Sequence, residues 1–370
     1  MGGQGVLVVG SGLAAAAAAH AVTQAGVRVE VIERAQWWGG QLRTAQAAGI
    51  SYEPHGAHIF HTRDRQVWDL VSGLVPMLDY RHRVLTEVQD RLLSWPPQVE
   101  ELATLPQWPR IEAELARRPA VPSRANFEEW TVDVMGPTLY EWFVRPYTVK
   151  QWGTDPRNLS AHWAPKRLEL RTDGCRDLFR DPFQGWPAGG YTGLVDRLLE
   201  QVPVTMGVEV TAANWAEMTR GYQAVVLTSA LDELFADALG PLPWRGVRLV
   251  HRWVPHVEHV LAAAVVNHPG EDQPYTRRIE TKWMSGQSGA GTVVSEEIPG
   301  SDARHYPVDD AAGVNRALAA RYVQLVGAEL GDHVLVAGRL ATYSYIDMDQ
   351  AVRQGLNAGA AAVRRVLGGG

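Results

Sequence analysis

Residues 6–22 read VLVVGSGLAAAAAAHAV. Val6 to Val9 are apolar and mostly β-branched, which is typical of a strand buried on both faces of a parallel sheet. Gly10 and Gly12 permit a tight turn and a close backbone approach, and the alanines that follow favour a helix. The N-terminus of such a helix offers free N–H groups and partial positive charge to a diphosphate. The stretch therefore predicts the strand, glycine turn and helix of a dinucleotide-binding unit.

A second apolar stretch, residues 27–32, ends in Glu33 about 20 residues beyond the glycines, where a carboxylate can accept hydrogen bonds from ribose hydroxyls. Glu33 is followed by Gly39 and Gly40. This acid-plus-Gly-Gly pattern resembles FAD-binding proteins of the glutathione-reductase type. The resemblance implies FAD rather than NAD.

The composition narrows the classes of function. The chain has 370 residues, 46% hydrophobic, and a formal charge of -6, so it can bury a large core and offers no basic stripe for nucleic acid. Cys175 is the only cysteine, which excludes an internal disulfide and fits the cytoplasm. Because Gly10 and Gly12 interrupt the apolar run, we expect no membrane span.

Six short blocks follow one another along the chain. They are GSGL at 10–13, GAHIFHT at 56–62, YTVKQWG at 147–153, FQGWPAGGYTGL at 183–194, PYTRRIE at 274–280 and GRLATYSYIDM at 338–348. In order and spacing these blocks resemble the UDP-galactopyranose mutases, and the resemblance runs nearly from end to end.

The resemblance implies an α/β fold in three parts. We expect a glutathione-reductase-type, Rossmann-like dinucleotide-binding domain from residues 1–80, 188–243 and 315–370. A small helical domain is expected at 96–160, where 98–145 is rich in helix formers. An antiparallel β-sheet domain is expected from 81–95, 161–187 and 244–314, where 244–298 alternates as strands do.

Members of this family are isomerases that interconvert the pyranose and furanose forms of a hexose carried on a nucleotide diphosphate. The resemblance implies reduced FAD as the nucleophile at the anomeric carbon and no net redox change. It implies a UDP-galactose-like or GDP-hexose substrate, with a homodimer as a possible assembly.

The resemblance also assigns roles to individual residues, inside and outside these blocks. By resemblance, the catalytic residues are His61, Arg171, Arg277 and Tyr345, the arginines being suited to paired hydrogen bonds with diphosphate oxygens. The cofactor residues are Gly10, Gly12, Glu33, Gly39, Gly40, His58, Gly338, Arg339, Asp347 and Met348. The substrate residues are Phe143, Tyr147, Thr148, Trp152, Phe183 and Tyr306.

Several residues depart from the family pattern near the cofactor. Trp37 and Trp38 precede the glycine pair, Ala337 replaces a glycine, and Ala15 stands at the third glycine of the fingerprint. Two alternatives therefore remain open. One is the same isomerisation without flavin but with Mn or Mg, for which the candidate ligands are His55, His58, His61, Asp347 and Asp349. The other is an amine-oxidase-like flavoenzyme.

The residues expected to form the nucleotide pocket also depart from the family pattern. In WFVRPYT, residues 142–148, Val144 and Pro146 replace residues usual in the family, and Phe183 stands where a tyrosine often assists the phosphates. A smaller side chain at Val144 leaves room for a larger base, which makes guanine an alternative to uracil.

Overall fold

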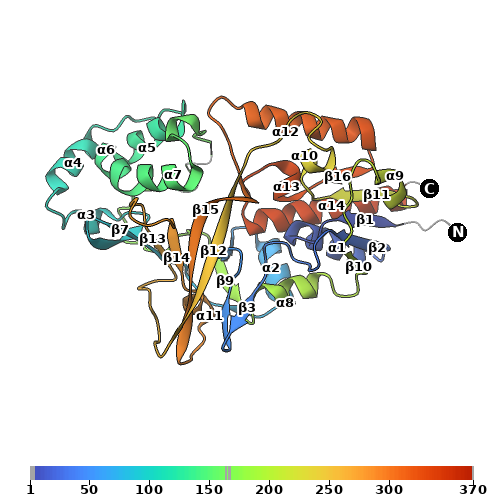
Figure 1. Ribbon diagram of the computed structural model, residues 1–370, viewed down its shortest axis with the longest axis horizontal. Helices are drawn as coiled ribbons and strands as arrows, with labels where there is room; N and C mark the ends of the chain where they lie inside the picture. Colours follow the sequence, from blue (N-terminus) through green and yellow to red (C-terminus); the bar gives the residue numbers. More distant parts are fainter. Residues whose placement is uncertain (1–4, 163–164, 166–167, 369–370) are drawn as a thin grey trace.

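The computed structural model describes residues 5–162, 165 and 168–368. A parallel-sheet region and a helical region lie at opposite ends, and the long strands β12 (Trp244–Pro255) and β15 (Gly291–Pro307) run between them (Figure 1). The fold class is the α/β, Rossmann-like one expected from the sequence. The proposed three-part division stays a prediction, and residues 1–4, 163, 164, 166, 167, 369 and 370 of its ranges lie outside the described part.

The parallel sheet has five strands in the order β10-β2-β1-β11-β16. They are β1 (Val6–Val9), β2 (Val29–Glu33), β10 (Val204–Met206), β11 (Ala224–Leu227) and β16 (Val334–Val336), and every pair is parallel. All four residues of β1 are buried, as a central strand with both faces covered requires.

Helix α1 (Leu13–Gln24) lies against the C-terminal helix α14 (Met348–Gly368). Glycines make this contact close: a Cβ at Gly355 would lie 2.1 Å from the backbone oxygen of Ala14, and one at Gly359 would lie 2.6 Å from that of Ala18. The alanine-rich helix and two glycines therefore fix the C-terminal segment onto the first βα unit.

The second large sheet has six strands in the order β12-β15-β14-β13-β7-β8. The other four are β7 (Val84–Val88), β8 (Arg91–Trp95), β13 (Val265–Asn267) and β14 (Arg277–Ile279). Its pairs are antiparallel, as expected, except that β13 pairs with β7 in parallel. These two strands are far apart in the chain, so no hairpin dictates their relative direction.

The helical region consists of short helices around its own apolar core, which includes Ile111, Phe127 and Met135. The helices are α3 (Val99–Leu102), α4 (Trp108–Ala116), α5 (Phe127–Met135), α6 (Pro137–Leu139) and α7 (Arg145–Trp152). A π-helical stretch, Tyr140–Val144, directly precedes α7. Such π-turns re-aim side chains and occur often at functional sites.

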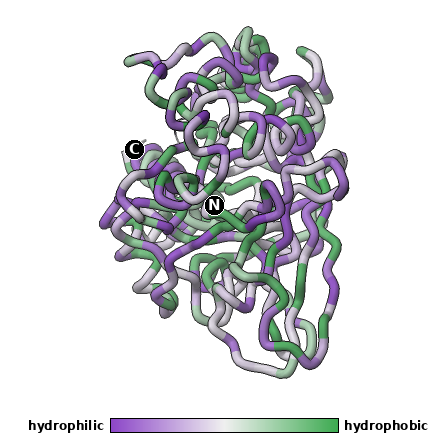
Figure 2. Tube along the Cα trace, turned by 90° about the vertical axis from the view of Figure 1, so that its left-hand side faces the viewer, coloured by the Kyte–Doolittle hydropathy of each residue, from purple (hydrophilic) through white to green (hydrophobic). Residues whose placement is uncertain are grey.

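The remaining strands and helices complete the fold. They are β3 (Ala45–Ala47), β4 (Ile50–Tyr52), β5 (Phe60–Thr62), β6 (Met77–Leu78), β9 (Phe183–Pro187), α2 (Arg65–Leu74), α8 (Tyr191–Leu198), α9 (Trp215–Met218), α10 (Leu231–Leu234), α11 (Lys282–Ser285), α12 (Val314–Leu325) and α13 (Gly338–Thr342). Hydrophobic and hydrophilic segments alternate along the trace (Figure 2). Within the described ranges, no helix is both long and apolar enough to span a membrane.

Candidate active site

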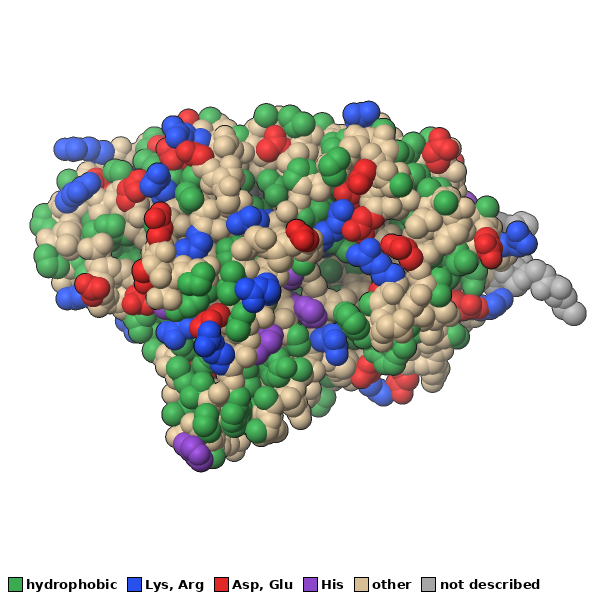
Figure 3. Space-filling model, viewed as in Figure 1, with side chains coloured by type: hydrophobic (Ala, Val, Ile, Leu, Met, Phe, Trp, Pro, Cys, Tyr) green, Lys and Arg blue, Asp and Glu red, His purple; other side chains and the backbone are tan. Residues whose placement is uncertain are grey.

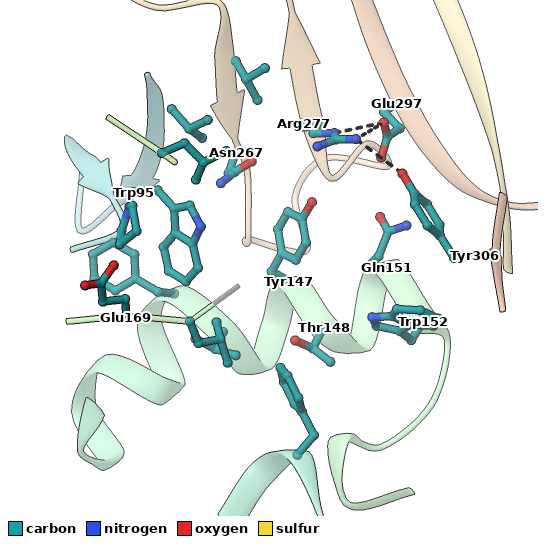
Figure 4. Close-up of a pocket in the computed structure, with 18 of the residues that line it drawn as sticks. Trp95, Tyr147, Thr148, Gln151, Trp152, Glu169, Asn267, Arg277, Glu297 and Tyr306 are labelled. Atoms are coloured by element: carbon teal, nitrogen blue, oxygen red, sulfur yellow. Dashed lines mark hydrogen bonds and ion pairs between the residues drawn. The ribbon is translucent and has the colours of Figure 1, made fainter. Parts of the chain in front are cut away.

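A cavity of about 460 Å³, here called the arginine cavity, lies between the helical region and the six-stranded sheet (Figure 4). Helix α7 and the π-helical stretch form one wall, and strands β13, β14 and β15 form the other. Seven residues expected from the sequence line it: Phe143, Tyr147, Thr148, Trp152, Arg277, Tyr306 and Tyr345. The structure thus brings together residues that are 202 positions apart in the chain (143 to 345).

Arg277 is the cationic group of this cavity. Its Nε and Nη2 donate to one oxygen of Glu297, Oε2, at 2.9 and 2.7 Å, and Nη2 also donates to the Tyr306 hydroxyl at 3.4 Å. Burial opposes the charge, but the Glu297 carboxylate outweighs it and raises the pKa of Arg277 well above its usual value. The guanidinium is therefore charged at any working pH.

Tyrosine hydroxyls surround this guanidinium. Burial raises the pKa of Tyr147 to about 12 and raises that of Tyr306 further. The rings of Tyr306 and Tyr345 stack with centroids 5.6 Å apart. Because the phenols of Tyr147 and Tyr306 stay protonated, they can donate hydrogen bonds to an anionic ligand beside Arg277.

A larger cavity of about 950 Å³, here called the glycine-loop cavity, lies over the carboxyl ends of β1 and β2. All ten residues expected to bind the cofactor line it: Gly10, Gly12, Glu33, Gly39, Gly40, His58, Gly338, Arg339, Asp347 and Met348. At Gly12, which caps α1 with φ -64°, an added Cβ would meet no atom within 4 Å. No side chain caps this helix, so its first N–H groups face open space that suits a diphosphate.

Glu33 supports the glycine turn as well. Its Oε2 accepts hydrogen bonds from the backbone N and the hydroxyl of Ser11 at 2.9 and 2.6 Å, and its Oε1 accepts from Ala35 N at 2.8 Å. Gly10 has φ +99°, a conformation that favours glycine. The carboxylate therefore holds the turn in place and keeps lone pairs for a ribose.

The two cavities share a wall made of two short strips of chain. In the first strip, His305 lines the glycine-loop cavity and its neighbour Tyr306 lines the arginine cavity. In the second strip, Ile346 lines the glycine-loop cavity and its neighbour Tyr345 lines the arginine cavity. Arg339 joins the strips, donating to His305 O at 3.0 Å and Ile346 O at 2.8 Å. On the face of the molecule shown in Figure 3, histidine side chains gather beside a central hollow. A ligand in one cavity therefore lies close to a ligand in the other.

His61 and His58 have different surroundings. The Nδ1 atom of His61 lies 2.6 Å from Asp181 Oδ2, and its ring stacks on Phe179 at 3.5 Å, so His61 lines neither cavity. His58 Nδ1 lies 2.7 Å from Oε2 of Glu53. Burial raises the pKa of Glu53. Both imidazoles are thus held by carboxylates, as the sequence could not show.

The metal ligand set suggested by the sequence was wrong. Asp349 accepts a hydrogen bond from the Thr62 hydroxyl at 2.9 Å, and His61 is turned toward Asp181. Among the residues the structure places, no three His, Cys, Asp or Glu side chains converge as metal ligands. His55, His58, His61, Asp347 and Asp349 therefore do not form one site.

Two other residues lie apart from the positions expected for them. Arg171 is buried and donates to Glu169 Oε2 at 2.9 Å, to the Cys175 and Leu178 backbone oxygens at 2.9 and 3.0 Å, and to the Asp177 backbone oxygen. Phe183 stacks on Trp68 with centroids 5.6 Å apart. Neither lines a cavity in this conformation, so contact with the phosphates stays a prediction for both.

The tryptophans before Gly39 do not fill the glycine-loop cavity. Trp38 is 38% exposed, and its Nε1 donates to Asp196 on α8 at 2.7 Å. Trp37 is 44% exposed and lies under the Arg43 guanidinium at the cavity rim. Ala337 is buried and forms the N-cap of α13. These departures leave the cavity open.

Two cavity histidines were missed at the sequence level. His82 lines the arginine cavity and His305 the glycine-loop cavity, and both are buried. Neither lies in one of the six matching blocks. An isolated histidine is common in cores, so only the folded arrangement distinguishes these two.

Comparison with known proteins identifies the family. A family model described as UDP-galactopyranose mutase matches residues 142–345, more than half of the chain. The chain belongs to the UDP-galactopyranose mutase family. A second model, the NAD(P)-binding Rossmann-like domain, matches residues 8–74 around the glycine-loop cavity.

Relatives of this family match almost the whole chain. A probable UDP-galactopyranose mutase of Klebsiella pneumoniae is 28% identical, covering 96% of this chain and 94% of the relative. A dTDP-fucopyranose mutase of Escherichia coli is 27% identical, covering 95% and 96%. The crystal structure of a reduced UDP-galactopyranose mutase superposes on this protein with a TM-score of 0.81 at 17% identity. The match covers 99% of this chain and 96% of the crystallised one, which supports the fold. The protein is a pyranose/furanose mutase, an isomerase, and the amine-oxidase alternative was wrong.

Proposed function

We propose that this mutase interconverts the pyranose and furanose forms of a hexose on a nucleoside diphosphate, a UDP-galactose-like sugar or a GDP-hexose, with reduced FAD as cofactor. The observation that carries the proposal is the wall shared by the two cavities. It places the Arg277 guanidinium on one side and the glycine turn of a dinucleotide site on the other.

The residues of the glycine-loop cavity fit FAD. Gly12 and the uncapped start of α1 suit its diphosphate, Glu33 suits its ribose, and the His58 end lies at the shared wall. When bound, reduced FAD supplies an electron pair that can displace a leaving group from carbon without net redox. Arg339 supports this end by holding the two wall strips together.

On the other side of the wall, the protein stabilises the leaving diphosphate. The Nε and Nη2 atoms of Arg277 donate hydrogen bonds to Glu297, and Nη1 has no protein partner within the described chain. A charge preorganised in this way, in a largely dry site, stabilises developing negative charge more than water does. The hydroxyls of Tyr147, Tyr306 and Tyr345 are placed to add hydrogen bonds to the same oxygens.

The end of the arginine cavity away from Arg277 holds Trp95, with Glu169 beside it (Figure 4). Phe143 and Val144 line the same cavity, and such aromatic and aliphatic side chains suit a base. Val144 is buried at 3% exposure in the π-helical stretch. Its small side chain supports a purine as an alternative to a pyrimidine, while the curated relatives act on UDP- and dTDP-sugars by name. A cytoplasmic location and a homodimer remain predictions.

The test is an anaerobic turnover assay with dithionite-reduced protein and added FAD, using UDP-galactose, dTDP-fucose and a series of GDP-hexoses. We expect the furanose product from at least one of them, detected by proton NMR. The protein should also show flavin absorption bands that bleach on reduction. Turnover that needs Mn or Mg and no flavin would overturn the cofactor, and turnover of none of these sugars would overturn the substrate class.

A further inference from the structure

His82 is a buried histidine of the arginine cavity that the proposed function has not used. It lies between β6 and β7, is 3% exposed, and lines the cavity. Its backbone oxygen accepts a hydrogen bond from Leu178 N at 2.6 Å. His82 is therefore a buried residue of the connection between β6 and β7, tied by its backbone to Leu178.

Tyr80 determines which ring nitrogen of His82 carries the proton. The Tyr80 hydroxyl lies 3.1 Å from His82 Nδ1. The same hydroxyl accepts a hydrogen bond from the Arg83 backbone, so its own proton is left for Nδ1. Burial keeps this phenol protonated by raising its pKa. Nδ1 is therefore an acceptor, and the imidazole proton resides on Nε2.

The surroundings also keep the imidazole neutral. Burial, then the charges of Arg277 and His61, lower the pKa of His82 to about 3. The charged and titratable groups that face this ring are Arg277, His61 and Tyr80. Within the described chain, no protein group is recorded as a partner of Nε2. A neutral donor is therefore available in the cavity.

The position of His82 indicates which part of the ligand it meets. The positive charge of Arg277, which faces the expected diphosphate, lowers the pKa of His82. The ring of Phe179 lies next to both histidines, with its centroid 6.2 Å from that of His82 and 3.5 Å from that of His61. The anomeric carbon of a nucleotide sugar is joined to the diphosphate and must also face the cofactor cavity. The hexose, rather than the base, therefore has to pass this point.

We propose that His82, oriented by Tyr80, is a positioning residue that donates a hydrogen bond from Nε2 to a hydroxyl or ring oxygen of the hexose. The inference rests on the proposed function, because it assumes a nucleotide sugar in the arginine cavity. A fixed, neutral donor orients the sugar without adding charge near Arg277, so binding of the diphosphate is left to the arginine.

The test compares His82→Phe, His82→Gln and Tyr80→Phe with the wild type by calorimetric titration of two ligands, the nucleotide sugar and the nucleoside diphosphate alone. We expect His82→Phe to weaken binding of the nucleotide sugar and lower kcat/KM by about tenfold or more, while affinity for the nucleoside diphosphate changes less than about twofold. His82→Gln, whose amide nitrogen can take the place of Nε2, should restore much of the difference.

Tyr80→Phe removes the donor that holds Nδ1 as an acceptor. Its loss should raise the pKa of His82, and the pH profile of kcat/KM should therefore fall at a higher pH on the acidic side than in the wild type. In ¹⁵N-histidine NMR spectra, the wild type should show the proton of His82 on Nε2. A proton on Nδ1 would overturn the proposal.

His268→Phe is the matched control, because His268 is also buried beside a tyrosine, Tyr275, but lines neither cavity. If His82→Phe weakens both ligands equally, His82 only packs the wall and the proposal fails. If the wild type binds the nucleotide sugar without isomerising it, the proposed function fails, whereas the difference between the two ligands still decides the role of His82. A thermal melt of each variant shows whether its fold is retained.

Discussion

Arg277 directs both Nε and Nη2 at a single carboxylate oxygen of Glu297, at 2.9 and 2.7 Å. The Glu297 side chain is 1% exposed and that of Arg277 24% exposed. The carboxylate therefore holds the guanidinium by its Nε and Nη2 edge and leaves Nη1 for a ligand. A charge held in this way needs no reorganisation when negative charge develops beside it.

Replacement of Arg277 by alanine should lower kcat by about 100-fold or more, because it removes a preorganised donor and charge from the leaving diphosphate. Initial rates of furanose formation measure this. Arg278→Ala is the control: Arg278 follows directly on β14 but points to the other face of the sheet, toward His268 and Tyr275. Near-normal turnover of Arg277→Ala would remove Arg277 from the site.

Replacement of Gly12 by valine should abolish flavin binding while the fold persists. Gly12 has φ -64° and no atom within 4 Å of an added Cβ, so a side chain there is unstrained but projects into the space expected for the diphosphate. We expect affinity for FAD to fall by about tenfold or more, measured by quenching of flavin fluorescence.

Gly73→Val is the matched control for this substitution. Gly73, on α2, also has open space around an added Cβ, and it lines neither cavity. If Gly12→Val binds FAD as tightly as the wild type, the diphosphate does not lie over α1. If the wild type itself binds no FAD, the cofactor proposal is wrong.

The sequence predicts the parts of this protein whose signals are local. The βαβ unit could be inferred because Val6 to Val9, Gly10, Gly12 and Glu33 are close in the chain and each serves one backbone requirement. The gathering of Phe143, Arg277 and Tyr345 around one cavity could be inferred only through resemblance, since no periodicity connects such distant segments.

The rest depends on contacts between distant segments that carry no pattern. The Asp181 partner of His61 and the parallel pairing of β13 with β7 are of this kind. Arg171 illustrates the opposite case: it was assigned to the site by resemblance, yet its guanidinium is occupied by the backbone oxygens of Cys175, Asp177 and Leu178. A matching residue type therefore does not determine the direction of its side chain.

Acid should destabilise the protein partly through His305. Burial, then the charges of His55 and Arg339, lower the pKa of His305 to about 4 from 6.5. Between these values the unfolded chain binds a proton on this side chain that the folded chain does not, so stability falls as the pH falls from about 6.5 to 4. One such proton contributes up to about 1.4 kcal/mol per pH unit.

His305→Asn should remove this contribution, since an asparagine oxygen can still accept the hydrogen bond that Val247 N donates to His305 Nδ1 at 3.2 Å. Urea unfolding at several pH values measures the effect, and the wild type should lose stability more steeply than the variant below about pH 6.5. His256→Asn, at an exposed position, is the control. Parallel curves for wild type and His305→Asn would contradict the assignment.

The size of the residue at position 144 should determine the preference for the base. Val144 is buried next to Phe143 and lines the arginine cavity, so Val144→Phe fills space that a purine would need. We expect binding of GDP to weaken by about tenfold relative to that of UDP, measured by calorimetric titration. Val149→Phe, on the following helix α7 and 36% exposed, should leave the ratio unchanged. If Val144→Phe keeps the wild-type ratio while its thermal melt shows an intact fold, the base is selected by other residues of the cavity, and the argument for guanine from side-chain volume is lost.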